Sequence, residues 1–178
     1  MSVVATRPAE PAATPTAPVC SIVIPSYNGW RWLEPCLESV QRHRPDSPPI
    51  EVIVVDDAST DGTVRLVTQR FPWVRLVQNR ENQGFCGAAN AGIAAARGAF
   101  IQLPNNDAEV TEGWIEAGLA AFEHEDVGAV APLVLIRSDP TRVDSAGDCY
   151  AFLGWPAKRG HGEPVGRWSQ RPAETVFG

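Results

Sequence analysis

Short apolar runs alternate along the chain with segments in which apolar residues recur every three or four positions. Runs of that length indicate buried strands, and the longer spacing indicates the buried face of a helix. The pattern predicts strands at 19–24, 50–55, 74–77, 100–103 and 127–136, with helices in the first four intervals between them. This alternation is typical of an α/β fold, here a mostly parallel sheet with helices on both faces. Right-handed crossovers would then bring the carboxyl ends of the strands to one edge.

The pattern also divides the chain into three parts. Residues 1–18 are rich in Pro and Ala and have no periodicity, so we expect a disordered tail. Residues 19–136 carry the alternation and form the predicted α/β domain. Residues 137–178 are rich in Gly, Pro and Trp, and we interpret them as an irregular continuation of the same domain.

Composition narrows the class of protein. The chain has 178 residues, 44% of them apolar, which suits one domain with a sizeable core. A net charge of -6 argues against a nucleic-acid partner, whose electrostatic footprint is basic. We find neither a signal-peptide pattern nor an apolar stretch long enough to span a bilayer. The cysteines lack a Cys-x-x-Cys pair, so we expect four reduced core residues and a cytoplasmic protein; they are Cys20, Cys36, Cys86 and Cys149.

Polar clusters follow two of the predicted strands directly. Asp56 and Asp57 come after the strand at 50–55, and Asn105-Asn106-Asp107 follow the strand at 100–103. Ligands of parallel α/β sheets bind just outside the carboxyl ends of the strands. Mg²⁺ and Mn²⁺ prefer the oxygen ligands that these side chains offer. The sequence therefore predicts a site for a metal and a hydroxyl-rich, nucleotide-like ligand.

The loop motifs resemble, in order and spacing, those of the inverting glycosyltransferases of family two, which have the GT-A fold. The matching segments are 21–28, 54–63, 79–85 with 90–92, and 103–107. The resemblance covers 19–136 well. Three later pieces, at 145–147, 159–160 and 176–178, resemble the rhamnosyltransferase-type branch. The resemblance implies transfer of a sugar from a nucleotide diphosphate donor to an acceptor hydroxyl, in glycan or cell-wall polysaccharide synthesis.

The resemblance also assigns roles to individual residues. It implies that Asp57 accepts the imide N–H of uracil or thymine, so the donor would be a UDP- or dTDP-sugar, while Asp56 supports the loop. Tyr27 either stacks on the base or is buried beneath the sheet edge. Asp107 would be the anionic ligand of Mn²⁺ or Mg²⁺, because Asn105 replaces the first acid of the family's Asp-x-Asp motif.

Further polar and loop residues would line the donor nucleotide by the same resemblance. Each also has a local explanation, as an Asx turn or as a polar loop. The set is Pro25, Asn28, Asn82, Gly84, Asn90, Asn105 and Asn106.

The catalytic base stays unassigned. In the family it lies downstream of the position of Gly178, so we expect the chain to be truncated before an acceptor-side segment. The candidates that we consider between 137 and 170 are Asp144, Asp148 and Glu163, and none stands in a matching motif. We expect a glycan or lipid-linked acceptor, which would draw the protein to the inner face of the cell membrane.

Functions of other classes remain as alternatives. A non-catalytic module that binds a nucleotide sugar or a metal would also lack a base. A sugar-phosphate nucleotidyltransferase would need a cation in the loop after the first strand, and Pro25-Ser26-Tyr27-Asn28-Gly29 has none. A dinucleotide oxidoreductase would need Gly-x-Gly-x-x-Gly there.

Overall fold

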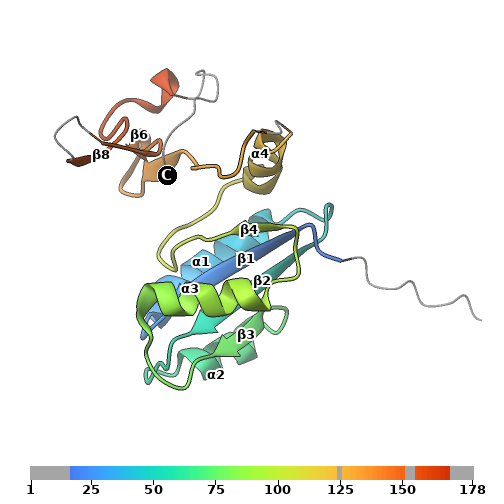
Figure 1. Ribbon diagram of the computed structural model, residues 1–178. Helices are drawn as coiled ribbons and strands as arrows, with labels where there is room; N and C mark the ends of the chain where they lie inside the picture. Colours follow the sequence, from blue (N-terminus) through green and yellow to red (C-terminus); the bar gives the residue numbers. More distant parts are fainter. Residues whose placement is uncertain (1–16, 124–125, 151–154, 169–178) are drawn as a thin grey trace, which may run out of the picture. The chain divides into compact units, whose positions relative to one another are not determined.

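The computed structural model describes residues 17–123, 126–150 and 155–168 (Figure 1). The chain divides after Glu112 into two compact units, Met1–Glu112 and Gly113–Gly178. This division falls earlier than the domain end predicted at 136. Residues 1–16 of the predicted disordered tail lie outside the described residues, and residues 17 and 18 have no regular structure.

The first unit contains a parallel sheet with the strand order β3-β2-β1-β4. Its strands are β1 (Cys20–Ser26), β2 (Ile50–Asp56), β3 (Arg75–Gln78) and β4 (Phe100–Gln102). β1 and β2 pair over seven positions, from Cys20 opposite Ile50 to Ser26 opposite Asp56. The predicted α/β fold with a mostly parallel sheet is thus confirmed.

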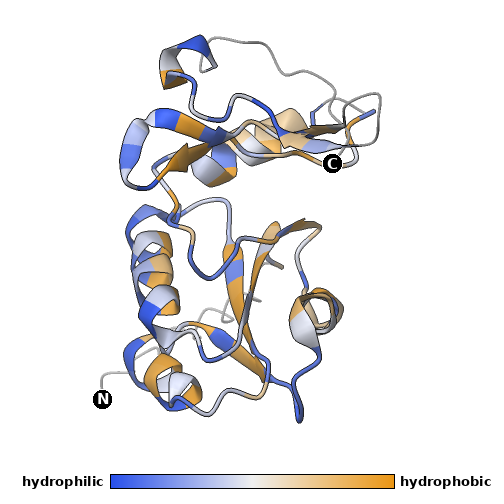
Figure 2. Ribbon diagram, turned by 90° about the vertical axis from the view of Figure 1, so that its left-hand side faces the viewer, coloured by the Kyte–Doolittle hydropathy of each residue, from blue (hydrophilic) through white to orange (hydrophobic). Residues whose placement is uncertain are grey.

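Helices cover both faces of this sheet. α3 (Gly84–Ala95) lies on one face, and α1 (Trp30–His43) and α2 (Thr63–Arg70) lie on the other (Figures 1 and 2). The middle strands are almost continuously apolar because strands buried on both faces have no polar side (Figure 2). Between the sheet and α3 the core consists of Val23, Ile53, Val55 and Ala88. On the other face, the apolar residues that α1 buries are Leu33, Cys36, Leu37 and Val40.

Pro25 stands inside a central strand, which is unusual because proline cannot donate to a strand ladder. The register explains why it is tolerated. β4 pairs only with Cys20–Ile22, so at Pro25 the strand β1 has β2 as its neighbour but not β4. The sheet is therefore open on one side of β1 towards its carboxyl end.

A buried carboxylate fastens the opposite, amino-terminal edge of the sheet. The Glu51 side chain, 9% exposed, accepts hydrogen bonds from Ser21 Oγ at 2.7 Å and from the Arg97 N–H at 2.7 Å. The Arg97 guanidinium lies 2.9 Å from the second carboxylate oxygen. Gly98 passes so close to β1 that a Cβ there would lie 2.6 Å from the Ser21 nitrogen. The link from α3 to β4 is thus held against β1.

The second unit is built from local antiparallel pairs. α4 (Trp114–Ala121) precedes β5 (Val134–Ile136), which pairs with β6 (Asp139–Ser145). β7 (Asp148–Tyr150) pairs with β8 (Pro156–Lys158), and a short 3₁₀ helix, η1 (Val165–Arg167), follows. Val143 of β6 is fully buried. Within the described ranges of the chain, no helix is long and apolar enough to cross a membrane.

The predicted fifth strand of the parallel sheet is wrong. Of 127–136, only Val134–Ile136 is a strand, and it pairs antiparallel with β6. Residues 128–133 are exposed, and Pro132 among them lacks an N–H for a ladder. A two-residue turn lets β5 fold back on the segment that follows it. Residues 137–178 are accordingly not irregular throughout, since they contain β6, β7 and β8.

The prediction of four core cysteines is also wrong. Cys20 and Cys36 are buried, but Cys86 and Cys149 are exposed, so the cysteines are not all core residues; each of the four is free.

The contacts of Glu51 lead to a prediction about stability. Burial opposes its ionisation, but hydrogen bonds from Arg97 and Ser21 outweigh burial and lower its pKa below the ordinary value of 4.5. The folded state therefore binds the proton less tightly than the unfolded state. Its contribution is fully present above pH 4.5 and disappears as the pH falls through the lowered pKa.

We expect Glu51→Gln to lower the free energy of unfolding at pH 7 by about 2 kcal/mol, because charge-assisted hydrogen bonds are lost. The difference from the wild type should shrink below pH 4.5. Urea unfolding at pH 7 and pH 3.5 measures both. A difference that is the same at both pH values would contradict the assignment.

Candidate functional site

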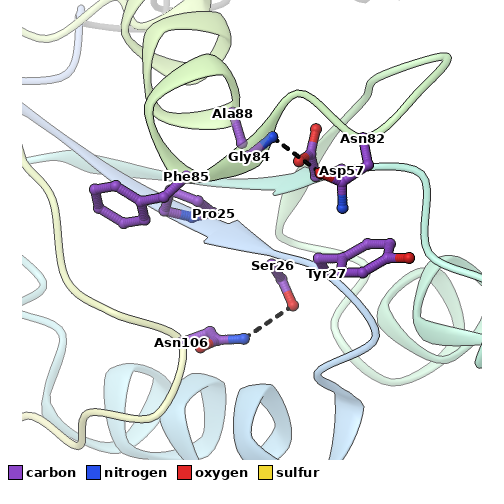
Figure 3. Close-up of a pocket in the computed structure, with 9 residues that line it drawn as sticks. All are labelled: Pro25, Ser26, Tyr27, Asp57, Asn82, Gly84, Phe85, Ala88 and Asn106. Carbon is purple, nitrogen blue, oxygen red and sulfur yellow. Dashed lines mark hydrogen bonds between the residues drawn. The ribbon is translucent and has the colours of Figure 1, made fainter.

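The loops that leave the carboxyl ends of β1, β2, β3 and β4 meet around one pocket of about 400 Å³ (Figure 3). Its lining residues are Pro25, Ser26, Tyr27, Asp57, Asn82, Gly84, Phe85, Ala88 and Asn106. Pockets for small ligands typically measure about 300–1,000 Å³. The structure thus brings together six of the predicted donor-binding residues: Pro25, Tyr27, Asp57, Asn82, Gly84 and Asn106. Asn28, Asp56, Asn90, Asn105 and Asp107 are not among the lining residues.

Asp57 is the charged residue of the lining, and its side chain is 2% exposed. Its carboxylate accepts hydrogen bonds from Asn79 Nδ2 at 2.7 Å and from the Gln83 N–H at 3.0 Å. Its own N–H donates to the Ser26 carbonyl at 2.9 Å. Asp57 therefore connects the loops after β1, β2 and β3. A carboxylate has about four acceptor sites, so capacity remains for a donor from a ligand.

Asp56 has a different environment from its neighbour, because consecutive side chains of a strand point to opposite faces. Asp57 shares the pocket with α3 residues, so Asp56 belongs to the face of α1 and α2. One of its oxygens accepts from the Ser59 N–H at 3.1 Å. The other, Oδ1, is buried and has no hydrogen-bond partner in the described part of the protein. Asp56 thus contributes to the β2 exit loop and not to the pocket lining.

The β1 exit loop presents Tyr27 and turns at Asn28. Tyr27 is 51% exposed and lines the pocket, so its ring is not buried beneath the sheet edge. The Asn28 amide oxygen accepts from the Thr60 N–H at 2.7 Å and lies 3.4 Å from Thr60 Oγ1. The Asn28 N–H donates to Ser59 Oγ at 2.9 Å. The Asn28 amide oxygen is therefore directed at the β2 exit loop.

The start of α3 forms the third side of the pocket. Asn82 Oδ1 accepts from the Gly84 N–H at 3.0 Å, which is the local role that a polar residue before a helix often has. Gly84 has a φ of 71°, a left-handed conformation that glycine adopts without a steric penalty. Phe85 follows with 55% of its side chain exposed. Asn90 lies further along α3 and is exposed.

The β4 exit loop carries the predicted metal ligand. Asn106 Nδ2 donates to Ser26 Oγ at 3.2 Å and packs so closely on Gly29 that a Cβ there would collide with it. The Asn105 carbonyl accepts from the Ala108 N–H at 3.2 Å, which closes a turn. Asp107, on this turn, is exposed.

The negative charge of Asp107 also affects the pKa of a buried thiol, that of Cys36. Burial and, after it, the negative charges of Asp107 and Glu109 raise the pKa of Cys36 to about 12. Cys36 therefore stays protonated and unreactive at neutral pH.

Sequence reasoning missed three lining residues, Ser26, Phe85 and Ala88. Ser26 and Ala88 are small, buried residues without a chemical signal of their own. Phe85 does carry a signal in the sequence. It follows a glycine at the start of a predicted helix, where no preceding helical turn covers an aromatic side chain.

Comparison with known proteins identifies the fold family. A family model described as glycosyl transferase family 2 matches residues 21–170, which include all four exit-loop motifs. The chain belongs to glycosyl transferase family 2. The family predicted from the motifs is confirmed. Its rhamnosyltransferase-type branch stays a prediction.

Curated relatives agree with this membership of family 2. The glycosyltransferase AglE of Haloferax volcanii is 30% identical over 120 residues, which make up 66% of this chain and 40% of AglE. The glycosyltransferase GlyG of Streptococcus pneumoniae serotype 4 is 30% identical over 113 residues, which make up 62% of this chain and 37% of GlyG. The chain spans about two fifths of the length of these relatives.

Solved structures confirm the GT-A fold. The mannosyltransferase PcManGT from Pyrobaculum calidifontis, in complex with GDP-Man and Mn²⁺, superposes with a TM-score of 0.60 at 27% identity. The superposed part makes up 70% of this chain and 38% of the PcManGT chain. The S. aureus protein TarS 1-349, in complex with UDP-GlcNAc, has a TM-score of 0.55 at 23% identity and covers 66% of this chain and 38% of its own.

The side chains of the β4 exit loop would suit a metal whose ligand shell a bound substrate completes. In the described ranges, no group of three or more His, Cys, Asp or Glu residues could hold a metal ion by itself. Asp107 and its neighbours in sequence, Asn105 and Asn106, carry the oxygen ligands that Mg²⁺ and Mn²⁺ prefer. Mg²⁺ commonly takes one or two carboxylates and completes its shell with water and substrate phosphates.

Two of the acids considered as a base are engaged within the second unit. Asp144 forms an ion pair with Lys158 at 2.7 Å, and Glu163 accepts from Trp168 Nε1 at 2.9 Å. Asp148 lies exposed on β7. These contacts do not assign a catalytic base.

We expect Asp57→Asn to lower the free energy of unfolding by about 2 kcal/mol, because an amide N–H would face the donors of Asn79 and Gln83. Asp107→Asn is the matched control. It changes an exposed acid in the same way, so the free energy of unfolding should stay within about 0.5 kcal/mol. Urea unfolding followed by tryptophan fluorescence measures both, and equal effects would contradict the structural role of Asp57.

Proposed function

We propose that the chain binds a nucleotide diphosphate sugar in this pocket and that the sugar is transferred, with inversion, to an acceptor hydroxyl. The observation that carries the proposal is the Asp57 carboxylate, which is buried in a pocket at the carboxyl edge of a parallel sheet. Ligands of open α/β sheets bind at such an edge, at the point where the strand order reverses. Membership of family 2 supports the reaction class.

The base that fits Asp57 must present an N–H, because an ionised carboxylate only accepts hydrogen bonds. The imide N–H of uracil or thymine is complementary to it, which favours a UDP- or dTDP-sugar. Tyr27 offers an exposed aromatic ring on the same pocket, and stacking on an aromatic ring suits any base. Guanine also presents N–H groups, and PcManGT is in complex with GDP-Man, so GDP belongs in the test.

The diphosphate needs a positive partner that the pocket lining does not supply. None of the nine lining residues is Lys or Arg. We propose that Asp107, together with oxygens of Asn105 or Asn106, holds Mn²⁺ or Mg²⁺ against the donor phosphates. When bound, the metal neutralises charge that develops on the leaving diphosphate, an effect worth several kcal/mol.

Transfer with inversion needs one displacement. The acceptor oxygen bonds to the anomeric carbon while the bond from that carbon to the diphosphate oxygen breaks, and the hydroxyl proton passes to a base. We propose a glycan or lipid-linked acceptor in cell-wall polysaccharide synthesis, reached at the inner face of the cell membrane. Asp57, Tyr27 and Asn106 would hold the donor in place for this step.

We expect metal-dependent binding of UDP or dTDP. Calorimetry with UDP, dTDP, GDP and ADP, each with Mn²⁺ and with EDTA, measures affinity and metal dependence. Tighter binding of GDP would move the assignment of the base to guanine. Equal affinity for ADP, or affinity that EDTA leaves unchanged, would count against the proposed site.

We expect Asp107→Ala to remove the Mn²⁺-dependent part of nucleotide affinity, about tenfold or more, because the loop loses its anionic ligand. Glu112→Ala is the matched control, since it removes another exposed acid. Titrations with and without Mn²⁺ compare both variants with the wild type. Full metal-dependent affinity of Asp107→Ala would exclude Asp107 as the ligand.

A further inference from the structure

The β1 and β2 exit loops are joined by hydrogen bonds that run in both directions. The Thr60 N–H donates to the Asn28 amide oxygen at 2.7 Å, and the Asn28 N–H donates to Ser59 Oγ at 2.9 Å. Ser59 is itself fixed, because its N–H donates to the Asp56 carboxylate at 3.1 Å. We call Asn28, Ser59 and Thr60 the loop clamp.

The backbone around the loop clamp adopts conformations that need support. Asn28 has a φ of 47° and Ala58 a φ of 64°, so each loop contains a non-glycine residue in the left-handed region. Such residues persist where the surroundings hold them, and they concentrate at functional sites. Asn tolerates this region better than most residues, which makes it suitable for a turn that must also supply an acceptor.

The clamp lies next to the residues that line the pocket. Tyr27 directly precedes Asn28, and Asp57 stands two positions before Ser59. Tyr27 and Asp57 stand in different exit loops, directly after the last ladder pair, and the Asp57 N–H still donates to the Ser26 carbonyl. The hydrogen bonds of the clamp continue the link between the loops beyond the last ladder pair, Ser26 and Asp56.

We propose that Asn28 is a positioning residue for the nucleotide: it fixes Tyr27 relative to Asp57 and does not itself contact the base. This inference rests on the proposed function of the pocket. A direct contact through the amide oxygen would compete with the bond from Thr60, which at 2.7 Å is short for an N–H donor. Fixing the two sides of the pocket before binding lowers the ordering cost of binding.

Three substitutions separate the acceptor from the backbone conformation. Asn28→Gly keeps the left-handed turn and removes the acceptor. Asn28→Asp keeps an acceptor oxygen at the same position and also tolerates the turn. Asn28→Ala removes both. Gln69→Ala is the control, because it deletes an amide acceptor for Arg65 on the exposed side of α2.

Hydrogen exchange of the Thr60 amide in the ligand-free protein tests the clamp by itself. Asn28→Gly should speed this exchange about tenfold, Asn28→Asp should leave it within about threefold of the wild type, and Gln69→Ala should not change it. Unchanged exchange in Asn28→Gly would overturn the clamp, whatever the protein binds.

Calorimetry with UDP and Mn²⁺ tests the role in binding. Asn28→Gly and Asn28→Ala should weaken the affinity about tenfold, and Asn28→Asp should restore most of it. Wild-type affinity in Asn28→Gly would overturn the positioning role. So would equal losses in Asn28→Gly and Asn28→Asp, because the amide group would then be needed for contact. A wild-type protein that binds none of the four nucleotides would instead refute the proposed function, while Thr60 exchange still decides the clamp.

Discussion

The site depends on the early end of β4. This strand stops pairing with β1 at Gln102, opposite Ile22, while β1 continues to Ser26 beside β2 alone. The opening admits Pro25 into a central strand and makes room for Asn106, which reaches across to β1. A longer β4 would fill this space with ladder hydrogen bonds, and the exit loops of β1 and β4 would have no gap to surround.

The two adjacent aspartates at the carboxyl end of β2 have different tasks on the two faces of the sheet. Asp57 is on the side of α3, where its carboxylate joins three exit loops and meets the pocket. Asp56 is on the other side, where it holds the turn at Ser59. Successive side chains along an extended backbone point to opposite faces, which places the two aspartates on different sides. One motif therefore supplies both a lining residue of the pocket, Asp57, and a residue that stabilises the exit loop, Asp56.

Much of the first unit was predictable from the sequence, because strands buried on both faces leave long apolar runs that end in polar loops. Asp57 was found for the same reason. The role of Asn28 was not, since its partner Thr60 lies 32 positions away and a polar loop residue has no periodicity to reveal such a contact. The prediction of one strand over 127–136 was wrong because it was based on apolar composition alone. Composition takes no account of the missing N–H of Pro132 or of the turn that pairs β5 with β6.

Besides its bond from Asn106 to β1, the exit loop of β4 contacts α1 at two points. Cys36 Sγ of α1 lies 3.8 Å from the Asn105 carbonyl, and the Val110 N–H donates to Ser39 Oγ of α1 at 3.0 Å. Asp107 stands between these two points of contact with α1. These contacts restrain the loop already in the ligand-free protein, which lowers the ordering cost of binding. A substitution of Ser39, on the buried face of α1, would remove one of these contacts and make the segment around Asp107 less rigid. It would do so without altering any atom that a ligand touches.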